Sequence, residues 1–183
     1  MLLAWIAVAL AGPVPMVEAS TAEESLLTAG QVAVRFEDDG SIIAIVDVSA
    51  SPEATLDAVL DLPARAGDIE SLEKVELYKP TTQTSLHAKY FTSLMGLEAI
   101  FHIEYSIDRG EGYTEYRLDK SQDNDLNDSH GSYQVYEHGS GTRLVYRSTV
   151  DGGAAARMVK KAVLSDSLPE QLLGMKRRAE AAD

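Results

Sequence analysis

Residues Ala50 to Leu60, which read ASPEATLDAVL, decide the fold that the sequence predicts. The stretch directly follows an apolar strand, Ile42–Val48, and short alternating strands come after it. One long amphipathic helix then closes the chain. This order predicts an α+β fold, in which a curved antiparallel sheet of about seven strands wraps around the long C-terminal helix. Such a shape favours a cavity that holds an apolar molecule.

Turn signals define the strand pairs. Asp39-Gly40 is a hairpin signature. Glycine-containing turns also fall at 109–112 and 139–141, and Pro80 marks a fourth turn. The predicted pairs are Val32–Phe36 with Ser41–Ser49, Val75–Lys79 with Ser85–Thr92, Leu97–Asp108 with Tyr113–Lys120, and Ser132–His138 with Thr142–Asp151.

The inner surface of the sheet is predicted to be apolar and rich in tyrosine, because side chains alternate between the two faces of a strand. An inward tyrosine needs a partner for its hydroxyl, and in a cavity that partner is water or a ligand oxygen. The same rings would also serve to fill a solid core, so both interpretations stay open. The predicted ligand-binding residues of the sheet and the helix are Phe101, Ile103, Tyr105, Tyr116, Leu144, Tyr146, Met158 and Leu168.

The terminal helix is amphipathic. Apolar or small residues recur at intervals of three and four between Met158 and Ala179, which places them on one face. Pro169 interrupts the pattern, and a proline inside a helix removes a backbone hydrogen bond. We therefore expect either a kink near Ser165–Leu168 or a break into two helices.

The first residues resemble an export signal. Leu2–Ala11 is apolar and has about the length of the hydrophobic part of a signal peptide. Val17-Glu18-Ala19 fits the residues that a signal peptidase reads, so we expect cleavage after Ala19 and a periplasmic or secreted protein. A flexible segment is expected over 20–29 and a single domain over 30–183. The chain has no cysteine, which excludes a disulfide framework.

The net negative charge of the chain limits the kinds of molecule that it is expected to bind. Twenty-nine acidic residues against 16 basic ones give a formal net charge of −13. Nucleic acids and anionic membrane surfaces attract clustered lysine and arginine, so this acidity argues against both. We expect a monomer with no nucleic-acid partner and no stable membrane insertion after leader removal.

No catalytic constellation is evident. The alternation places His87 and His102 opposite the apolar face, and His130 and His138 fall in or beside turns. All four are therefore expected at the surface. The known motifs for nucleophilic or zinc-dependent hydrolysis do not occur, so we predict no catalytic residues, no metal and no cofactor.

A calcium-binding site is one hypothesis for the acidic loop that begins at Asp123. Asp123, Asp125 and Asn127 resemble the start of a calcium-binding loop. The pattern then fails, because Asp128 stands where glycine is needed and Gln134 stands where glutamate is needed. The loop is predicted to be a solvated connection between strands.

Several short motifs, in their order and spacing, resemble one known superfamily. They are VDVSASPE at 46–53, LDLP at 60–63, GSYQV at 131–135, GTRLVY at 141–146 and LPEQL at 168–172. Together they resemble the START/polyketide cyclase superfamily, whose fold is called helix-grip or birch-pollen-allergen-like. Ala64-Arg65-Ala66-Gly67 stands where these proteins often have a loop with aromatic and proline residues.

The resemblance implies a protein that binds lipids, sterols, quinones or polyketides between the sheet and the long helix, and a minority of the superfamily are cyclases, hydrolases or oxygenase subunits. No catalytic residue set carries over. The expected function is therefore an exported binder, and possible transporter, of a hydrophobic small molecule. The alternatives are a cyclase-like or hydrolase-like enzyme that uses tyrosine and a carboxylate in the same cavity, and a protein-interaction module with a filled core.

Overall fold

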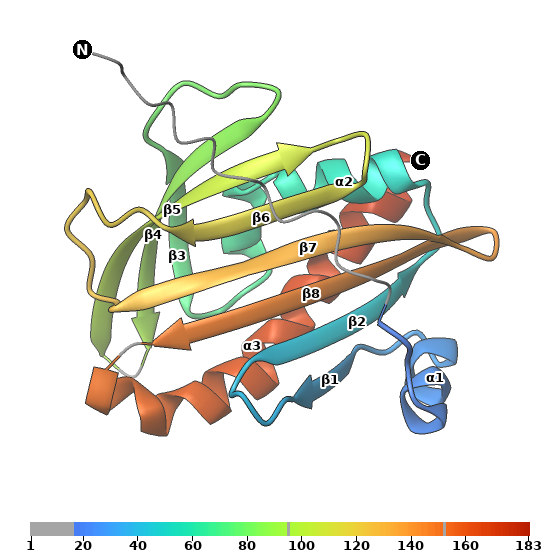
Figure 1. The fold of residues 1–183 in the computed structure, drawn as a ribbon, viewed down its shortest axis with the longest axis horizontal. Coiled ribbons are helices and arrows are strands. Elements are labelled where there is room, and N and C mark those ends of the chain that lie inside the picture. The colour runs from blue at the N-terminus through green and yellow to red at the C-terminus, as the bar shows by residue number, and fades with distance from the viewer. Residues whose placement is uncertain (1–16, 95, 152) are drawn as a thin grey trace, which may run out of the picture.

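One open antiparallel sheet forms the body of the protein. The structure, a computed structural model, describes residues 17–94, 96–151 and 153–183, without the side chains of 94, 97 and 153–166. Eight strands follow the order β1-β2-β8-β7-β6-β5-β4-β3 (Figure 1). Their bounds are β1 Ala33–Phe36, β2 Ile42–Val48, β3 Leu72–Leu77, β4 Ser85–Leu94, β5 Leu97–Asp108, β6 Tyr113–Leu118, β7 Asp128–His138 and β8 Gly141–Asp151.

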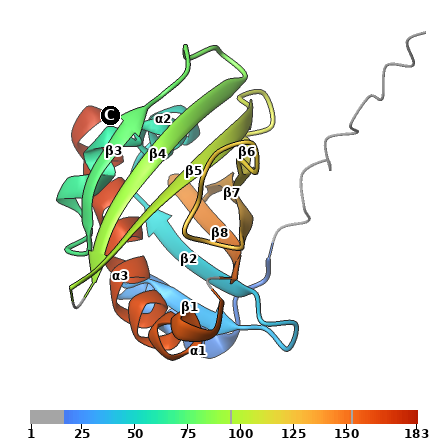
Figure 2. The ribbon, with the colours of Figure 1, turned by 90° about the vertical axis from the view of Figure 1, so that its left-hand side faces the viewer.

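The helices lie mainly on the inner side of the sheet. Figure 2 shows the sheet curving around α3 (Gly153–Ala182). Between β2 and β3 the chain forms α2 (Pro52–Leu60) and the short 3-10 helix η1 (Pro63–Gly67). The α+β helix-grip architecture is confirmed, with eight strands rather than about seven. No helix among the described residues has both the length and the apolar character needed to cross a bilayer.

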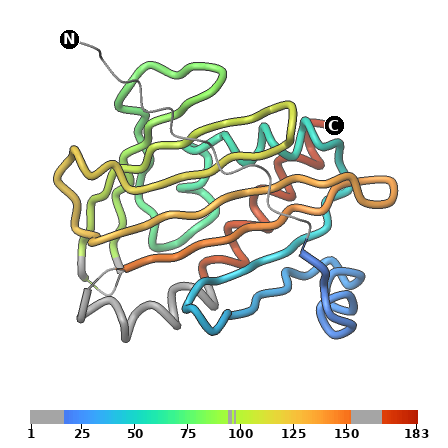
Figure 3. Tube along the Cα trace, in the orientation of Figure 1, coloured from blue at the N-terminus to red at the C-terminus, as the bar shows by residue number. Residues whose placement is uncertain are grey.

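The predicted hairpins are all present, and one further pairing joins distant parts of the chain. β2 pairs with β8, with Asp47 opposite Arg143, and the two strands run side by side in Figure 3. Ser51 caps α2 through its hydroxyl, and Pro52 occupies the first turn, where its missing N–H costs nothing. The short helix therefore starts immediately after β2 and carries the chain over to the far edge of the sheet.

The closing helix runs unbroken through Pro169, so a break into two helices does not occur. The backbone bond lost at the proline is offset by packing, because Leu168, Leu172, Met175 and Ala179 are all buried against the inner face. Burial of a leucine or methionine side chain stabilises by about 1.5–3 kcal/mol. The predicted apolar face of this helix is confirmed for these four residues.

A second, smaller core lies on the outer face of the sheet. The stretch 20–29, predicted to be flexible, contains α1 (Thr21–Thr28), whose first turn is held by a reciprocal hydrogen-bond pair between Ser20 and Glu23. The members of this outer core are Val17, Leu27, Ala33, Ile43, Ile45 and Val145. Both faces of β2 and β8 are therefore covered.

Candidate functional site

The most unusual feature of the interior is a buried arginine. Arg65 lies in η1 and is only 3% exposed, because the turn after α2 directs its side chain inward. Its Nη2 donates to the carbonyl of Val59 at 2.7 Å. Its Nη1 lies 3.2 Å from the hydroxyl oxygens of both Tyr90 and Tyr105. Its Nε is buried and finds no hydrogen-bond partner in the described part of the chain.

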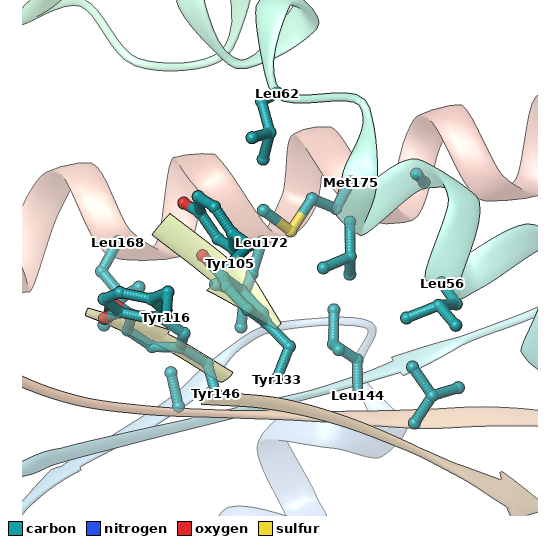
Figure 4. Close-up of a cluster of buried hydrophobic side chains, with 14 of the residues drawn as sticks. Leu56, Leu62, Tyr105, Tyr116, Tyr133, Leu144, Tyr146, Leu168, Leu172 and Met175 are labelled. Carbon is teal, nitrogen blue, oxygen red and sulfur yellow. Dashed lines mark hydrogen bonds between the residues drawn. The ribbon is translucent and has the colours of Figure 1, made fainter. Parts of the chain in front are cut away.

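Aromatic rings surround this guanidinium. Its central carbon lies 5.1 Å from the ring centre of Tyr133 and 5.7 Å from that of Tyr105. Both distances are within the range of cation–π attraction. Figure 4 shows Tyr105, Tyr116, Tyr133 and Tyr146 grouped beside Leu168 and Leu172 of α3. The positive charge thus sits at one end of a tyrosine-lined apolar interior.

The tyrosine hydroxyls form two linked pairs. The hydroxyl oxygens of Tyr90 and Tyr105 are 2.6 Å apart, and those of Tyr116 and Tyr146 are 2.8 Å apart. Tyr116 also donates to Ser148 at 2.7 Å. Burial raises the pKa of Tyr105 and Tyr116 well above the ordinary tyrosine value. These hydroxyls are therefore neutral at physiological pH and can donate or accept hydrogen bonds.

The charge of Arg65 is not neutralised within the described part of the chain, where no carboxylate pairs with it. Removing a cation from water is costly unless a counter-charge and hydrogen bonds compensate. Neutral tyrosine hydroxyls supply dipoles but no negative charge. The arrangement is suited to receive an anionic or strongly polarised oxygen group.

The structure places the predicted lining residues as follows. Ile103, Tyr105, Tyr116, Leu144, Tyr146 and Leu168 are all buried in the inner core. Phe101 is partly buried and stacks on Tyr90, with parallel rings 5.1 Å apart. Met158 lies in the part of α3 whose side chains are outside the described set. Contact of these residues with a ligand stays a prediction.

Sequence reasoning found Tyr105, Tyr116 and Tyr146 but missed Arg65, Tyr90 and Tyr133. Tyr90 follows Leu86 and Ala88 at intervals of two, so the alternation that located Tyr105 could have found it. Tyr133 is almost fully buried and accepts a hydrogen bond from Gln171 of α3 at 2.7 Å. Arg65 carries no local signal, because a single arginine in a loop normally faces solvent.

The prediction for His102 was wrong. This histidine is 9% exposed, because the loop after β6 folds over it. Its ring Nδ1 lies 3.1 Å from the carbonyl of Asp123, and Asn124 accepts its backbone N–H. His87 is half-buried rather than at the surface. His130 and His138 are exposed, as predicted.

A surface pocket of about 460 Å³ opens beside the segment that carries Arg65. Ala66 and Gly67, which directly follow the arginine, form part of its wall. The remaining lining residues are Asp68, Ile69, Glu70, Glu170, Leu173 and Arg177. The pocket therefore lies between the η1–β3 connection and the second half of α3.

Comparison with known proteins identifies the fold. No family model and no curated protein matches the sequence, whereas solved structures match clearly. A protein from Thermus thermophilus superposes with a TM-score of 0.69 at 18% identity, over 78% of this chain and 99% of its own. The Zhui aromatase/cyclase from a Streptomyces species gives 0.65 at 16% identity, over 81% and 94%. A STAR-related lipid transfer protein from Xanthomonas axonopodis gives 0.61 at 14% identity, over 82% and 91%. The chain thus has the START/polyketide cyclase fold.

Proposed function

We propose that the protein holds a hydrophobic small molecule between the sheet and α3, with an acidic or oxygen-bearing end of that molecule at Arg65. The observation that carries the proposal is the buried guanidinium, which has hydrogen-bond partners but no carboxylate partner among the described residues. Solved structures with the same fold include a STAR-related lipid transfer protein and an aromatase/cyclase.

The two ends of the site would contribute differently. Apolar surface removed from water stabilises a complex by about 25 cal/mol per Å². A hydrogen bond to a charged group contributes about 1.5–3 kcal/mol. The rings of Tyr105, Tyr116 and Tyr146 would contact the apolar body, and Arg65 with Tyr90 would orient the polar end. Lipids, sterols, quinones and polyketides all combine an apolar body with an oxygen-bearing end.

Entry would require motion of the terminal helix or of the Leu62–Ile69 loop. The surface pocket lies at this junction. Asp68, which follows η1, forms an ion pair with Arg178 of α3 and closes the junction in the present state. Opening this contact would expose the segment that carries Arg65.

We also propose that the protein is exported as a monomer and carries its ligand in the periplasm. The apolar stretch Leu2–Ala11 and the residues before Ser20 support this location. Amino-terminal sequencing of the protein from a periplasmic extract tests it. A start at Ser20 is expected, and recovery of the intact chain from the cytoplasm alone would contradict it.

The binding test compares an acid with its ester. Native mass spectrometry with organic extraction would first reveal any co-purifying molecule. Fluorescence titration with cis-parinaric acid and with its methyl ester then separates the contribution of the ligand's carboxylate charge from that of its hydrocarbon chain. Wild type should bind the acid about tenfold tighter or more, since 1.4 kcal/mol is tenfold in affinity.

Two variants test whether Arg65 causes the difference in affinity between the acid and its ester. Arg65→Met should bind both probes with similar, weak affinity. The control is Arg109→Met, because Arg109 is an exposed arginine that pairs with Asp57. It should retain the preference of wild type. Failure of folded wild type to bind either probe or to co-purify with any molecule would overturn the proposal.

A further inference from the structure

The outer face of the sheet, opposite the tyrosines, carries a cluster of metal-ligand side chains. His87 and Glu104 are directly opposite each other on β4 and β5. Asp119 follows β6 and is brought alongside because its backbone N–H donates to the carbonyl of His102. One ligand atom from each of His87, Glu104 and Asp119 lies within 4.8 Å of the others.

We propose that His87, Glu104 and Asp119 bind one divalent transition-metal ion of the zinc class. One imidazole nitrogen and two carboxylate oxygens form a donor set that Zn²⁺ and Co²⁺ accept, with water completing the coordination. Strand register places His87 opposite Glu104. Asp119 directly follows β6 and is held beside them by the bond from its backbone N–H to the carbonyl of His102.

An orphaned ring nitrogen gives independent support. The Nδ1 of His87 is buried and has no hydrogen-bond partner among the residues that the structure describes. Buried polar atoms in native proteins are nearly always paired, and each exception calls for a ligand, a water or a chemical role. A neutral imidazole is a common metal ligand. A metal ion is one partner that would use this side chain.

The carboxylate of Asp119 is already oriented by neighbouring groups. Tyr78 donates to one oxygen of Asp119 at 2.7 Å, and Ser121 donates to the other through its backbone N–H at 3.0 Å. Such outer hydrogen bonds fix the orientation of metal ligands. Burial acts to raise the pKa of Asp119, but the bonds from Ser121 and Tyr78 outweigh it and lower that pKa, so the group is ionised at neutral pH.

Two cations balance the carboxylates in the present state. The Nζ of Lys79 lies 3.1 Å from Oδ2 of Asp119, and the Nε of Arg117 lies 2.5 Å from Oε1 of Glu104. The side chains of Lys79 and Arg117 are 41% and 62% exposed, so both can swing into solvent. An arriving metal ion would replace them. The lysine is therefore a competitor of the metal, and its removal should strengthen binding.

The test uses chelator-treated full-length protein. Zn²⁺ binding is measured by calorimetry, and Co²⁺ binding by its visible absorption. Wild type should bind one ion per chain, and His87→Ala should weaken binding about tenfold or more. Lys79→Met should tighten it. Circular dichroism shows that each variant is folded.

The matched control is His130→Ala. His130 also pairs with a carboxylate, Asp128, but it lies exposed on β7. This variant should bind the metal as wild type does. Equal losses in His87→Ala and His130→Ala would indicate adventitious surface binding and overturn the proposal. Weaker binding in folded Lys79→Met, or no stoichiometric binding to wild type, would overturn it too.

Discussion

The carboxylate of Asp68 lies so close to Gly174 of α3 that a β-carbon at position 174 would overlap it. The same carboxylate accepts from Arg178, one turn further along the helix. The contact joins Asp68, the residue directly after η1, to the long helix, and η1 carries Arg65. Closure of this end of the site thus depends on the absence of a side chain at position 174.

Gly174→Ala should destabilise the protein. Alanine gains about 1 kcal/mol over glycine in a helix, but overpacking a buried contact costs about 1–3 kcal/mol. Chemical denaturation should therefore show a lower free energy of unfolding. In an Asp68→Ala background the clash disappears, so the same substitution should stabilise. A stabilising effect of Gly174→Ala in the wild-type background would contradict this geometry.

Arg65→Met should cost the ligand-free protein little stability. The substitution removes hydrogen bonds to Tyr90, Tyr105 and the Val59 carbonyl, each worth about 0.5–1.5 kcal/mol net. It also removes a buried charge that no carboxylate of the described residues neutralises. Replacing buried charges by apolar groups is often neutral or stabilising by about 1–4 kcal/mol. Thermal unfolding without ligand should give a melting temperature equal to or above that of wild type. A fall of more than about 8 °C would show that the arginine is structural.

The buried tyrosines should ionise late and only with unfolding. Burial raises the pKa of Tyr105, Tyr116 and Tyr133 well above the ordinary value. Because the folded pKa is the higher one, their contribution to stability is complete below about pH 10 and lost above it. Absorbance of tyrosinate should rise together with loss of far-ultraviolet dichroism. Ionisation of all eight tyrosines in a still folded protein would refute the packed arrangement.

Asp119 should stabilise the metal-free protein at neutral pH and not in acid. Burial opposes ionisation of Asp119, but hydrogen bonds from Ser121, Tyr78 and Lys79 lower its pKa in the folded state. Its contribution is therefore present above the unfolded pKa of about 3.9 and disappears as pH falls below it. Asp119→Asn should lower the free energy of unfolding by about 1.5–3 kcal/mol at pH 7. Urea titrations in the presence of a chelator should show that the difference in free energy of unfolding between the variant and wild type shrinks as the pH is lowered. A gap that does not change with pH would contradict the ionised contact.

The sequence by itself determined the secondary-structure elements and, for most of them, which side chains face the core. Strand positions repeat every two residues, so the burial of Ile103, Tyr105 and Leu144 followed from the alternation. Turn glycines located the hairpins, and the spacing from Leu168 to Ala179 located the inner face of α3. These properties depend on neighbours in the chain, which is why a linear pattern carries them.

Tertiary structure alone decided where isolated polar residues lie. Arg65 became interior because η1 packs beneath α3, and Asp119 met His87 because β4, β5 and β6 are adjacent in the sheet. Pro169 stayed within one helix because packing on the sheet offset its lost backbone bond. Each outcome depends on contacts between residues far apart in the chain. No local period encodes such contacts, so the sequence predicted the tyrosine-rich inner face without the buried arginine beside it.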